Sequence, residues 1–245
     1  MSSGRHRAAE PDRGYVFDLE PDPVEVAPAP LEHDRIAGPA TLAAQSVSYA
    51  RAGRTILDQV SMRAEPGQVL AVVGPSGSGK SSLLALLAGL ERPDSGTVER
   101  EPRARTGLVL QGYGLVAVLT AAENVEAPLQ AGVLGRLSPT EIRRRSAAAL
   151  DSVGLTPVAD HLIEELSGGQ QQRVAIARAL AIDPSVVLAD ELSAELDHEW
   201  RERVVELVVD VARRGGVVVL ATHDPEVAGR ADQVVRLVDG RVAVA

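Results

Sequence analysis

Short apolar runs alternate along this chain with longer segments that repeat their apolar residues at helical spacing. Runs of four or five residues bounded by polar or glycine positions predict buried strands. These runs are 69–73, 106–110, 186–189 and 217–221. The longer segments predict helices at 82–88, 121–131, 141–153, 171–181 and 200–211. Strands that alternate with helices indicate an α/β fold with a parallel sheet.

The pattern changes near residue 40. Residues 1–39 hold six of the fifteen prolines, eight acidic residues against four arginines, and few apolar residues. Such a composition buries too little apolar surface to fold alone, so we expect a disordered acidic tail, with a docking segment at Tyr15–Leu19 as the alternative. Residues 40–245 are expected to form one domain that begins with short strands at 42–50 and 55–64.

Turn residues divide the rest of this domain. Pro93–Gly96 is expected to be a turn, and Asp239-Gly240 is expected to close a hairpin at the end of the chain. Residues from about 112 to 165 are helical and separate from the strands, which predicts a helical insertion.

The strand at 69–73 leads into the run Gly74-Pro75-Ser76-Gly77-Ser78-Gly79-Lys80-Ser81-Ser82. Its three spaced glycines let backbone amides turn inward around an anion, and the helix that follows adds its free N–H groups. This is the full phosphate-loop pattern of NTPases, and the alternative is a Gly/Ser turn before a helix. Lys80 is the only lysine, while the other 24 basic residues are arginines. A compact ammonium reaches between phosphates where a planar guanidinium would not fit.

Polar residues follow three more predicted strands, at the end where α/β sheets bind ligands. They are Gln111, the pair Asp190-Glu191, and Thr222-His223-Asp224. Two adjacent carboxylates at the end of a buried strand are costly unless a cation and a reaction occupy the site. The run Leu-Ser-Gly-Gly-Gln at 166–170 opens another helix, which gives the chain a second glycine-lined helix N-terminus suited to phosphate.

Composition narrows the classes of function. A net charge of −9 leaves no basic face large enough for a nucleic-acid duplex, so nucleic acid is not expected as the main partner. The absence of cysteine excludes disulfides and thiolate metal sites. The longest apolar runs are far too short to cross a bilayer, and the first residues lack the apolar core of a signal peptide, so a cytoplasmic location is expected.

Taken together, these motifs resemble the ATP-binding cassette (ABC) family over about residues 41–244. The run at 166–170, lying between Gln111 and Asp190-Glu191, is the most specific evidence. Leu166–Leu180 and Leu188–Glu191 are most similar to ATPases of the lipoprotein-releasing and macrolide-export type. The resemblance implies an α/β fold of the ABC type: a P-loop NTPase with a parallel-sheet core, an N-terminal antiparallel β subdomain and an inserted helical subdomain.

The resemblance also implies roles for individual residues. The loop amides and Lys80 would hold the β- and γ-phosphates of ATP, and Ser81, Gln111 and Asp190 would hold Mg²⁺. Glu191 would polarise the attacking water, and His223 would contact the γ-phosphate. The loop residues implied to bind ATP are Gly74, Pro75, Ser76, Gly77, Ser78, Gly79, Lys80, Ser81 and Ser82.

Two further groups are implied to bind nucleotide. Tyr49 would stack on the adenine, although it can also be read as an ordinary strand tyrosine. His223, whose contact with the γ-phosphate is given above, also has an alternative interpretation as a structural histidine. Ser167, Gly168, Gly169 and Gln170 would meet the ATP that a second subunit holds, so that two copies form an isologous dimer.

The function implied is an Mg²⁺-dependent ATPase subunit of an ABC transporter. It would be a homodimer, peripheral on the inner face of the cell membrane, and would drive a separately encoded transmembrane permease. One alternative is an ABC ATPase that regulates a membrane complex without transport, as in cell-division relatives. Another is a soluble ABC ATPase that acts on DNA or cofactor assembly, against which the acidic charge argues weakly.

Four residues depart from the family pattern, of which Gly112 and Gly114 follow Gln111 where bulkier polar residues are common. Leu192 follows Glu191 where the family usually has proline, and Glu195 replaces a small residue before Leu196-Asp197. This segment normally packs against the partner's phosphate loop. Glu195 is therefore expected either to alter communication between the two sites or simply to lie in solvent.

Overall fold

The computed structural model describes residues 41–243. The disordered tail and the docking segment expected within residues 1–39 lie outside this range. The strands are β1 (Leu42–Arg51), β2 (Arg54–Ala64), β3 (Val69–Val73), β4 (Ser95–Arg100), β5 (Thr106–Val109), β6 (Val186–Asp190), β7 (Val217–Thr222), β8 (Gln233–Val238) and β9 (Arg241–Val242). The helices are α1 (Lys80–Ala88), α2 (Ala121–Gln130), α3 (Pro139–Ser152), α4 (Gly168–Ala181), α5 (His198–Arg213) and α6 (Pro225–Ala228), with short 3₁₀ turns η1 (Thr156–Val158) and η2 (Ile163–Glu165).

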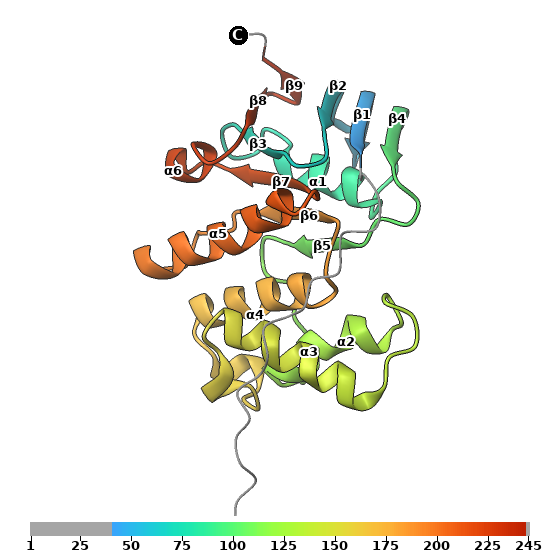
Figure 1. The fold of residues 1–245 in the computed structure, drawn as a ribbon. Coiled ribbons are helices and arrows are strands. Elements are labelled where there is room, and N and C mark those ends of the chain that lie inside the picture. Colours follow the sequence, from blue (N-terminus) through green and yellow to red (C-terminus); the bar gives the residue numbers. More distant parts are fainter. Residues whose placement is uncertain (1–40, 244–245) are drawn as a thin grey trace, which may run out of the picture.

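The strands form two sheets (Figure 1). The central sheet has the order β5-β6-β7-β3-β8-β9 and is parallel except for the β8–β9 hairpin. The small sheet has the order β2-β1-β4 and is antiparallel. These two sheets and the helices inserted between β5 and β6 confirm the predicted fold class.

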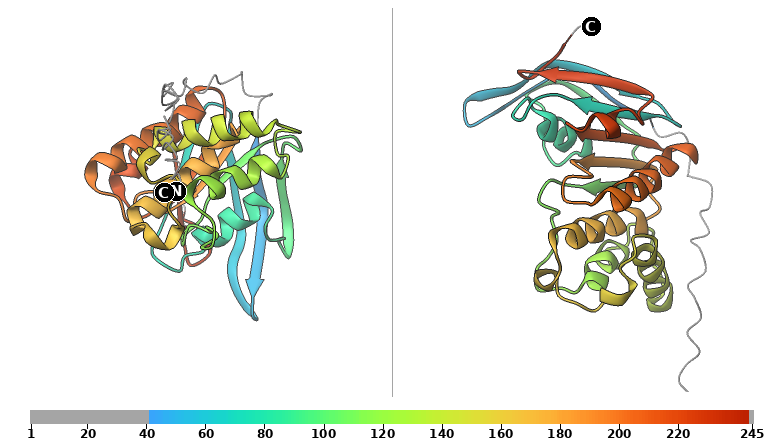
Figure 2. Two further views of the ribbon diagram at one scale, coloured as in Figure 1. Left: turned by 90° about the horizontal axis from the view of Figure 1, so that it is seen from below. Right: turned by 90° about the vertical axis from the view of Figure 1, so that its left-hand side faces the viewer.

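Alternate residues of the central sheet face two different cores, which explains the continuous apolar runs in its strands. In β6, Val186 and Leu188 face the core shared with α1 and the small sheet, while Val187 and Ala189 face the helices on the other side. Helix α1 lies between the two sheets, and α4 and α5 cover the opposite face (Figure 2). Helices α2 and α3 pack on α4 at the end of the molecule away from the small sheet.

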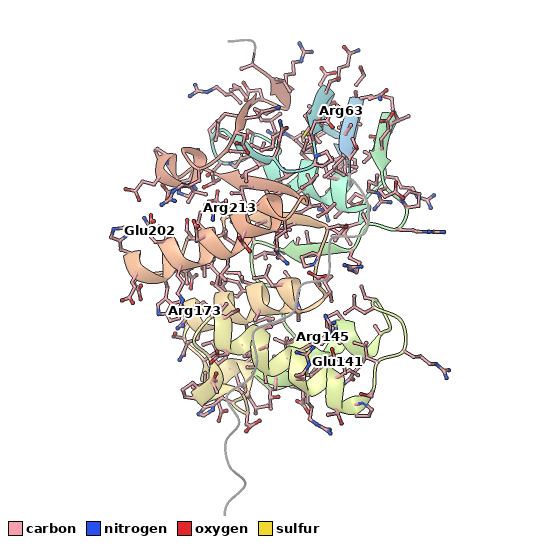
Figure 3. The ribbon with its side chains drawn as sticks, viewed as in Figure 1. Arg63, Glu141, Arg145, Arg173, Glu202 and Arg213 are labelled. Atoms are coloured by element: carbon pink, nitrogen blue, oxygen red, sulfur yellow. The ribbon has the colours of Figure 1, made fainter. Side chains whose placement is uncertain are left out.

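The helix ends follow the expected capping chemistry. Ser138 accepts from the Glu141 N–H at the start of α3, with Pro139 in the first turn. On the surface of this helix, Glu141 accepts hydrogen bonds from Arg144 and Arg145 (Figure 3). The Arg144 hydrogen bond, joined by that of Arg145, lowers the pKa of Glu141 to about 2 against the cost of desolvation. These pairs stabilise the first two turns of α3.

The predicted turn at Pro93–Gly96 and the predicted start of α4 are wrong, and α1, α3 and α5 each begin two residues before the predicted ranges. Ser95 and Gly96 belong to strand β4 and not to a turn, because Gly96 occupies an irregular position in the β1–β4 pairing with φ of 81°. A Cβ there would lie 2.3 Å from the Ser46 carbonyl oxygen, so the glycine serves a bulge. Helix α4 begins at Gly168 instead of Gln171, since Ser167 caps it through the Gln170 N–H.

Among residues 41–243, the structure contains no helix that combines the length and apolar character needed to span a membrane.

Candidate functional site

The phosphate loop connects the end of β3 to the start of α1 at the centre of the sheet. Gly77 and Gly79 adopt φ of 80° and 103°, a left-handed region that favours glycine. A Cβ on Gly74 would lie 2.0 Å from the carbonyl oxygen of Leu237 in β8, so this position admits only glycine. The β8–β9 turn also holds the loop, because the Gly240 N–H donates to the Ser78 carbonyl at 3.1 Å.

Lys80 lies inside the loop that precedes it. Its side chain is buried, and its Nζ donates to the carbonyl oxygens of Gly74 at 2.9 Å and Pro75 at 3.2 Å. The ammonium therefore closes the loop into a ring and places a positive charge beside the N-terminus of α1. Backbone amides and a fixed cation together make a site for a polyphosphate.

Two carboxylates lie opposite this cation, at the end of β6. Asp190 is buried, and burial raises the pKa of its carboxyl, while a hydrogen bond from the Ser81 hydroxyl lowers it. Glu191 is mostly buried, with φ of 54°, and its carboxylate lies 2.8 Å from Nδ1 of the exposed His223. A non-glycine residue keeps this left-handed conformation only when its surroundings hold it there, and the Glu191 N–H donates to the Ala221 carbonyl at 2.9 Å.

A cleft of about 560 Å³ brings most of the predicted residues together. Of the predicted site residues, those that line it are Ser76, Gly77, Gly79, Lys80, Ser81, Ser82, Gln111, Asp190 and Glu191. Further lining comes from residues that the sequence did not indicate, namely Arg54, Thr55, Ile56, Asp239 and Gly240. The cleft therefore joins the phosphate loop, the carboxylates of β6, the start of β2 and the β8–β9 turn.

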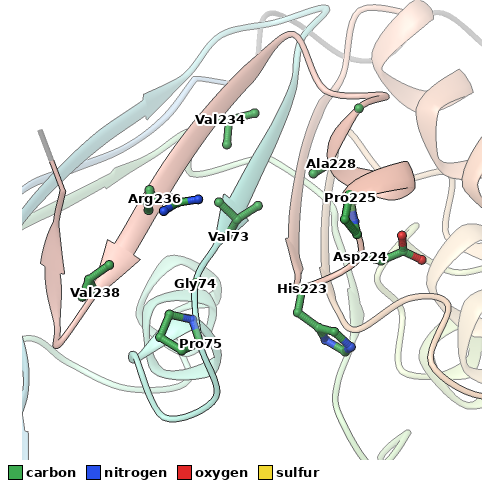
Figure 4. A pocket seen from close by; sticks show the side chains of 11 residues that line it. Val73, Gly74, Pro75, His223, Asp224, Pro225, Ala228, Val234, Arg236 and Val238 are labelled. Atoms are coloured by element: carbon green, nitrogen blue, oxygen red, sulfur yellow. The ribbon is translucent and has the colours of Figure 1, made fainter. Parts of the chain in front are cut away.

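Other predicted residues lie outside this cleft. Gly74, Pro75 and His223 line a neighbouring groove of about 510 Å³ beside β8, with Arg236 between Val234 and Val238 (Figure 4). Ser78, within the loop, is buried.

Tyr49 is also outside the cleft, since its ring packs in the core between the small sheet and α1 with 8% exposure. The stacking role predicted for Tyr49 stays a prediction, which this burial does not favour.

The glycine-rich start of α4 is a separate site in this chain. Ser167 and Gln170 form a reciprocal cap, in which the Ser167 N–H donates to Gln170 Oε1 at 2.9 Å. Ser167, Gly169 and Gln170 line a shallow pocket of about 310 Å³ with Glu195, and none of them lines the cleft. Within one chain, the start of α4 therefore does not reach the cleft of the phosphate loop. The expected contact of these residues with the ATP of a second subunit requires such a separation.

Sequence reasoning missed Gln172, a buried side chain of α4. Its Nε2 donates to the carbonyl oxygens of Glu191 at 2.9 Å and Leu192 at 2.6 Å, and its Oε1 accepts from the Glu195 N–H at 3.2 Å. Gln172 thus fixes the loop that follows β6. The sequence did contain a signal for this role. Gln172 lies two positions before the buried stretch Val174–Ala177 of α4, and a buried amide side chain must find hydrogen-bond partners.

The arrangement suits transfer of a phosphoryl group to water. A cation and amides face the place where phosphate charge would develop, and a paired carboxylate and imidazole lie at the other side. Ser81, Asp190 and Gln111 offer oxygen atoms, which are the ligands that Mg²⁺ prefers.

Comparison with known proteins agrees with this chemistry. A family model described as ABC transporter matches residues 57–194. An uncharacterized ABC transporter ATP-binding protein of Mycobacterium bovis is 37% identical over 223 residues, covering 84% of this chain and 67% of that protein. The macrolide export ATP-binding/permease protein MacB 2 of Aeromonas hydrophila is 41% identical over 203 residues, covering 77% of this chain but 31% of that protein.

A solved structure shows the same fold. The dimeric post-hydrolysis state of the ATP-binding cassette MJ0796, bound to ADP and Pi, matches with a TM-score of 0.77 and 34% identity, covering 83% of this chain and 97% of that one. The family model spans more than half of the chain, and several relatives exceed 30% identity over most of its length. The chain therefore belongs to the ABC transporter family, of which it is an ATP-binding subunit.

Proposed function

We propose that this chain hydrolyses ATP with Mg²⁺ and that two copies close around two nucleotides to drive a separately encoded membrane protein. The observation that carries this proposal is the single cleft that joins Lys80 and Ser81 to Asp190 and Glu191. The domain would be residues 40–245, with a helical insertion at about 112–165, and the subunit would lie on the cytoplasmic face of the membrane.

Each residue of the cleft has a proposed role in binding. Lys80 and the amides of residues 76–79 hold the β- and γ-phosphates, since a buried ammonium and a nest of N–H groups both favour anions. In this proposal Lys80 exchanges its bonds with the Gly74 and Pro75 carbonyls for bonds with phosphate oxygens. The resemblance alone assigns the adenine to Tyr49, and the burial of its ring argues against that role.

The residues present fit a magnesium ion. Asp190 is buried and accepts a hydrogen bond from the Ser81 hydroxyl, so the Ser81 oxygen and an Asp190 carboxylate oxygen lie close together. Gln111 lines the same cleft. Ser81, Asp190 and Gln111 would hold the ion, which would neutralise charge on the phosphates.

Glu191 is proposed as the general base. Its carboxylate is held by His223 at 2.8 Å, and its backbone N–H donates to the Ala221 carbonyl at 2.9 Å, so the group is fixed before substrate arrives. Glu191 orients water and accepts its proton, and His223 orients Glu191 and contacts the γ-phosphate. Phosphoryl transfer needs mainly such positioning and charge neutralisation.

The start of α4 would complete the site of a second copy. Ser167, Gly168, Gly169 and Gln170 lie apart from the cleft of their own chain, so a two-fold arrangement is the simplest way to bring them to a γ-phosphate. The dimeric MJ0796 structure supports this assembly. The permease portion of the MacB proteins supports a membrane partner for this chain.

The test is the Glu191→Gln variant. It should bind MgATP, hydrolyse it about 10² to 10⁴ times more slowly, and form a dimer on saturation with ATP. Phosphate release and sedimentation velocity measure the two effects. Hydrolysis at the wild-type rate would show that Glu191 is not the base, whereas slow hydrolysis by a persistent monomer would show that closure needs another subunit.

A further inference from the structure

Glu195 lies in the loop between β6 and α5, and its carboxylate contacts the first turn of α4. A Cβ on Gly168 would lie 1.8 Å from Glu195 Oε2, and one on Gly169 would lie 2.8 Å from the Glu195 carbonyl oxygen. The carboxylate therefore occupies the space that a side chain at position 168 would fill. Glu195 is exposed on its other side, so this contact is not forced by burial.

Two neighbours hold Glu195 in this position. The Tyr113 hydroxyl donates a hydrogen bond to the carboxylate, and the Gln172 side chain accepts from the Glu195 N–H at 3.2 Å. Tyr113 is itself fixed, because Arg178 of α4 donates to the carbonyl oxygens of Tyr113 at 2.8 Å and Gly114 at 2.5 Å. The backbone and the side chain of Glu195 are thus both restrained.

The contact is electrostatically favourable for one chain alone. The first N–H groups of a helix have no partners within it, and they attract an anion. The Ser167 hydroxyl accepts from the Gln170 N–H at 3.3 Å, and Glu195 lines the same shallow pocket as Ser167, Gly169 and Gln170. A nucleotide phosphate brought to the same turn carries the same sign of charge and would enter the space beside Gly168 that the Glu195 carboxylate occupies.

We propose that Glu195 is an internal competitor for the phosphate that α4 receives, held in place by Tyr113, and that it sets the ATP concentration at which two copies close. This inference rests on the proposed function, because the competing phosphate belongs to the ATP of a second copy. Closure requires the carboxylate to leave the first turn of α4, and Tyr113 opposes that movement. Glu195 does not line the cleft that holds Lys80 and Ser81, although it lines an adjoining pocket of about 220 Å³ together with Asp190 and Glu191.

The experiment compares variants in the slowly hydrolysing Glu191→Gln background. Glu195→Gln removes the charge and keeps the size, Glu195→Ala removes both, and Tyr113→Phe removes the hydroxyl that holds the carboxylate. Glu199→Gln is the matched control, since Glu199 is another exposed acid a few residues along, in the first turn of α5. Sedimentation velocity over a MgATP titration gives the half-saturation concentration for dimerisation, and a fluorescent ATP analogue gives nucleotide affinity of the monomer.

Both Glu195 variants should lower the half-saturation concentration about threefold or more, which is the size expected for one charge at a helix terminus. Tyr113→Phe should act in the same direction more weakly, and Glu199→Gln should have no effect. Affinity of the monomer for the analogue should be unchanged in all four. An unchanged or raised half-saturation concentration in Glu195→Gln would overturn the proposal.

Hydrogen exchange without nucleotide tests the contact independently of dimerisation. Glu195→Ala and Tyr113→Phe should speed exchange in residues 112–116, because both remove the bond that joins this segment to the loop after β6. If exchange is unchanged, Tyr113 does not hold Glu195 and the inference fails whatever the dimer does. A second outcome is that exchange rises but every protein in the Glu191→Gln background stays monomeric with saturating MgATP. The two-copy mechanism then fails, and so does the proposal that Glu195 competes with phosphate, while the contact between Tyr113 and Glu195 stands.

Discussion

Replacing Gln172 with methionine should lower both the stability of the fold and the rate of ATP hydrolysis. Methionine keeps the unbranched shape and removes three hydrogen bonds, to the Glu191 carbonyl, the Leu192 carbonyl and the Glu195 N–H. At about 1 kcal/mol for each bond, the free energy of unfolding should fall by about 3 kcal/mol. For a domain of this size that is a fall of about 6 to 12 °C in melting temperature.

The effect on hydrolysis follows from the position of Glu191. Its carboxylate is held by His223, but its left-handed backbone is held partly by Gln172 through the two carbonyl bonds. A shift of about 1 Å in a catalytic group costs on the order of 10²-fold in rate. We therefore expect kcat to fall by about that factor, with KM for ATP within about twofold, because the hydrogen bonds of Gln172 go to the loop after β6 and not to Lys80.

A matched control separates stability from catalysis. Asn124 in α2 is also a buried amide, and it bonds to backbone groups of Val116, Leu119 and Thr120, away from Glu191. Asn124→Leu should lower the melting temperature by a similar amount and leave kcat unchanged at a temperature where both variants are folded. Thermal denaturation and phosphate release give the two quantities. If Gln172→Met loses stability but hydrolyses ATP at the wild-type rate, Gln172 is structural and does not position Glu191.

Three further predictions concern single residues. Lys80→Ala should abolish phosphate release and greatly weaken ATP binding. Lys80→Arg should also be inactive, because a guanidinium does not fit where the Lys80 ammonium binds the Gly74 and Pro75 carbonyls. Full turnover in Lys80→Arg would contradict this prediction. Tyr49→Leu should lower the melting temperature and change the Kd for ATP by no more than about twofold, because the ring is buried; a rise of tenfold in Kd would establish the stacking role. Glu141→Gln should cost at most about 1 kcal/mol at pH 7, and the difference from wild type should shrink as pH falls from about 4.5 towards 2. The sign follows because the ionised Glu141 stabilises the fold at pH values above the pKa of this group in the unfolded chain, and this stabilisation is lost as Glu141 protonates. Chemical denaturation over this pH range measures the difference in free energy of unfolding, and a difference that grows on acidification would contradict the prediction.

The sequence predicted best the elements whose residues depend on burial or capping. The runs in β6 and β7 are buried on both faces, so four or five apolar residues were enough to identify them. The start of α3 also carries a local signal in Ser138-Pro139, because a cap and a first-turn proline act within a few residues. Strand β4 was missed because it is short, polar and largely exposed, so its residues show no apolar alternation.

The site was predictable where chemistry is concentrated in one motif. The phosphate loop and Asp190-Glu191 could be identified because glycine spacing and adjacent buried carboxylates are unusual in themselves. Gln172 and the Tyr113–Glu195 bond were not, because each joins segments far apart in the chain and neither residue type identifies its partner. The burial of Tyr49 depends in the same way on α1 and β2 packing around it.

The position of β3 between β7 and β8 has a consequence for synthesis of the protein. The phosphate loop emerges from the ribosome well before Leu237 and Gly240, which press against Gly74 and bond to Ser78. At 5 to 20 residues per second the interval is on the order of ten seconds or more. Until β7 emerges, β3 has neither neighbour, so a nascent chain carries an apolar strand with two open edges and an incomplete phosphate-loop site. Translation therefore has to reach the final hairpin before the phosphate loop gains its full set of contacts.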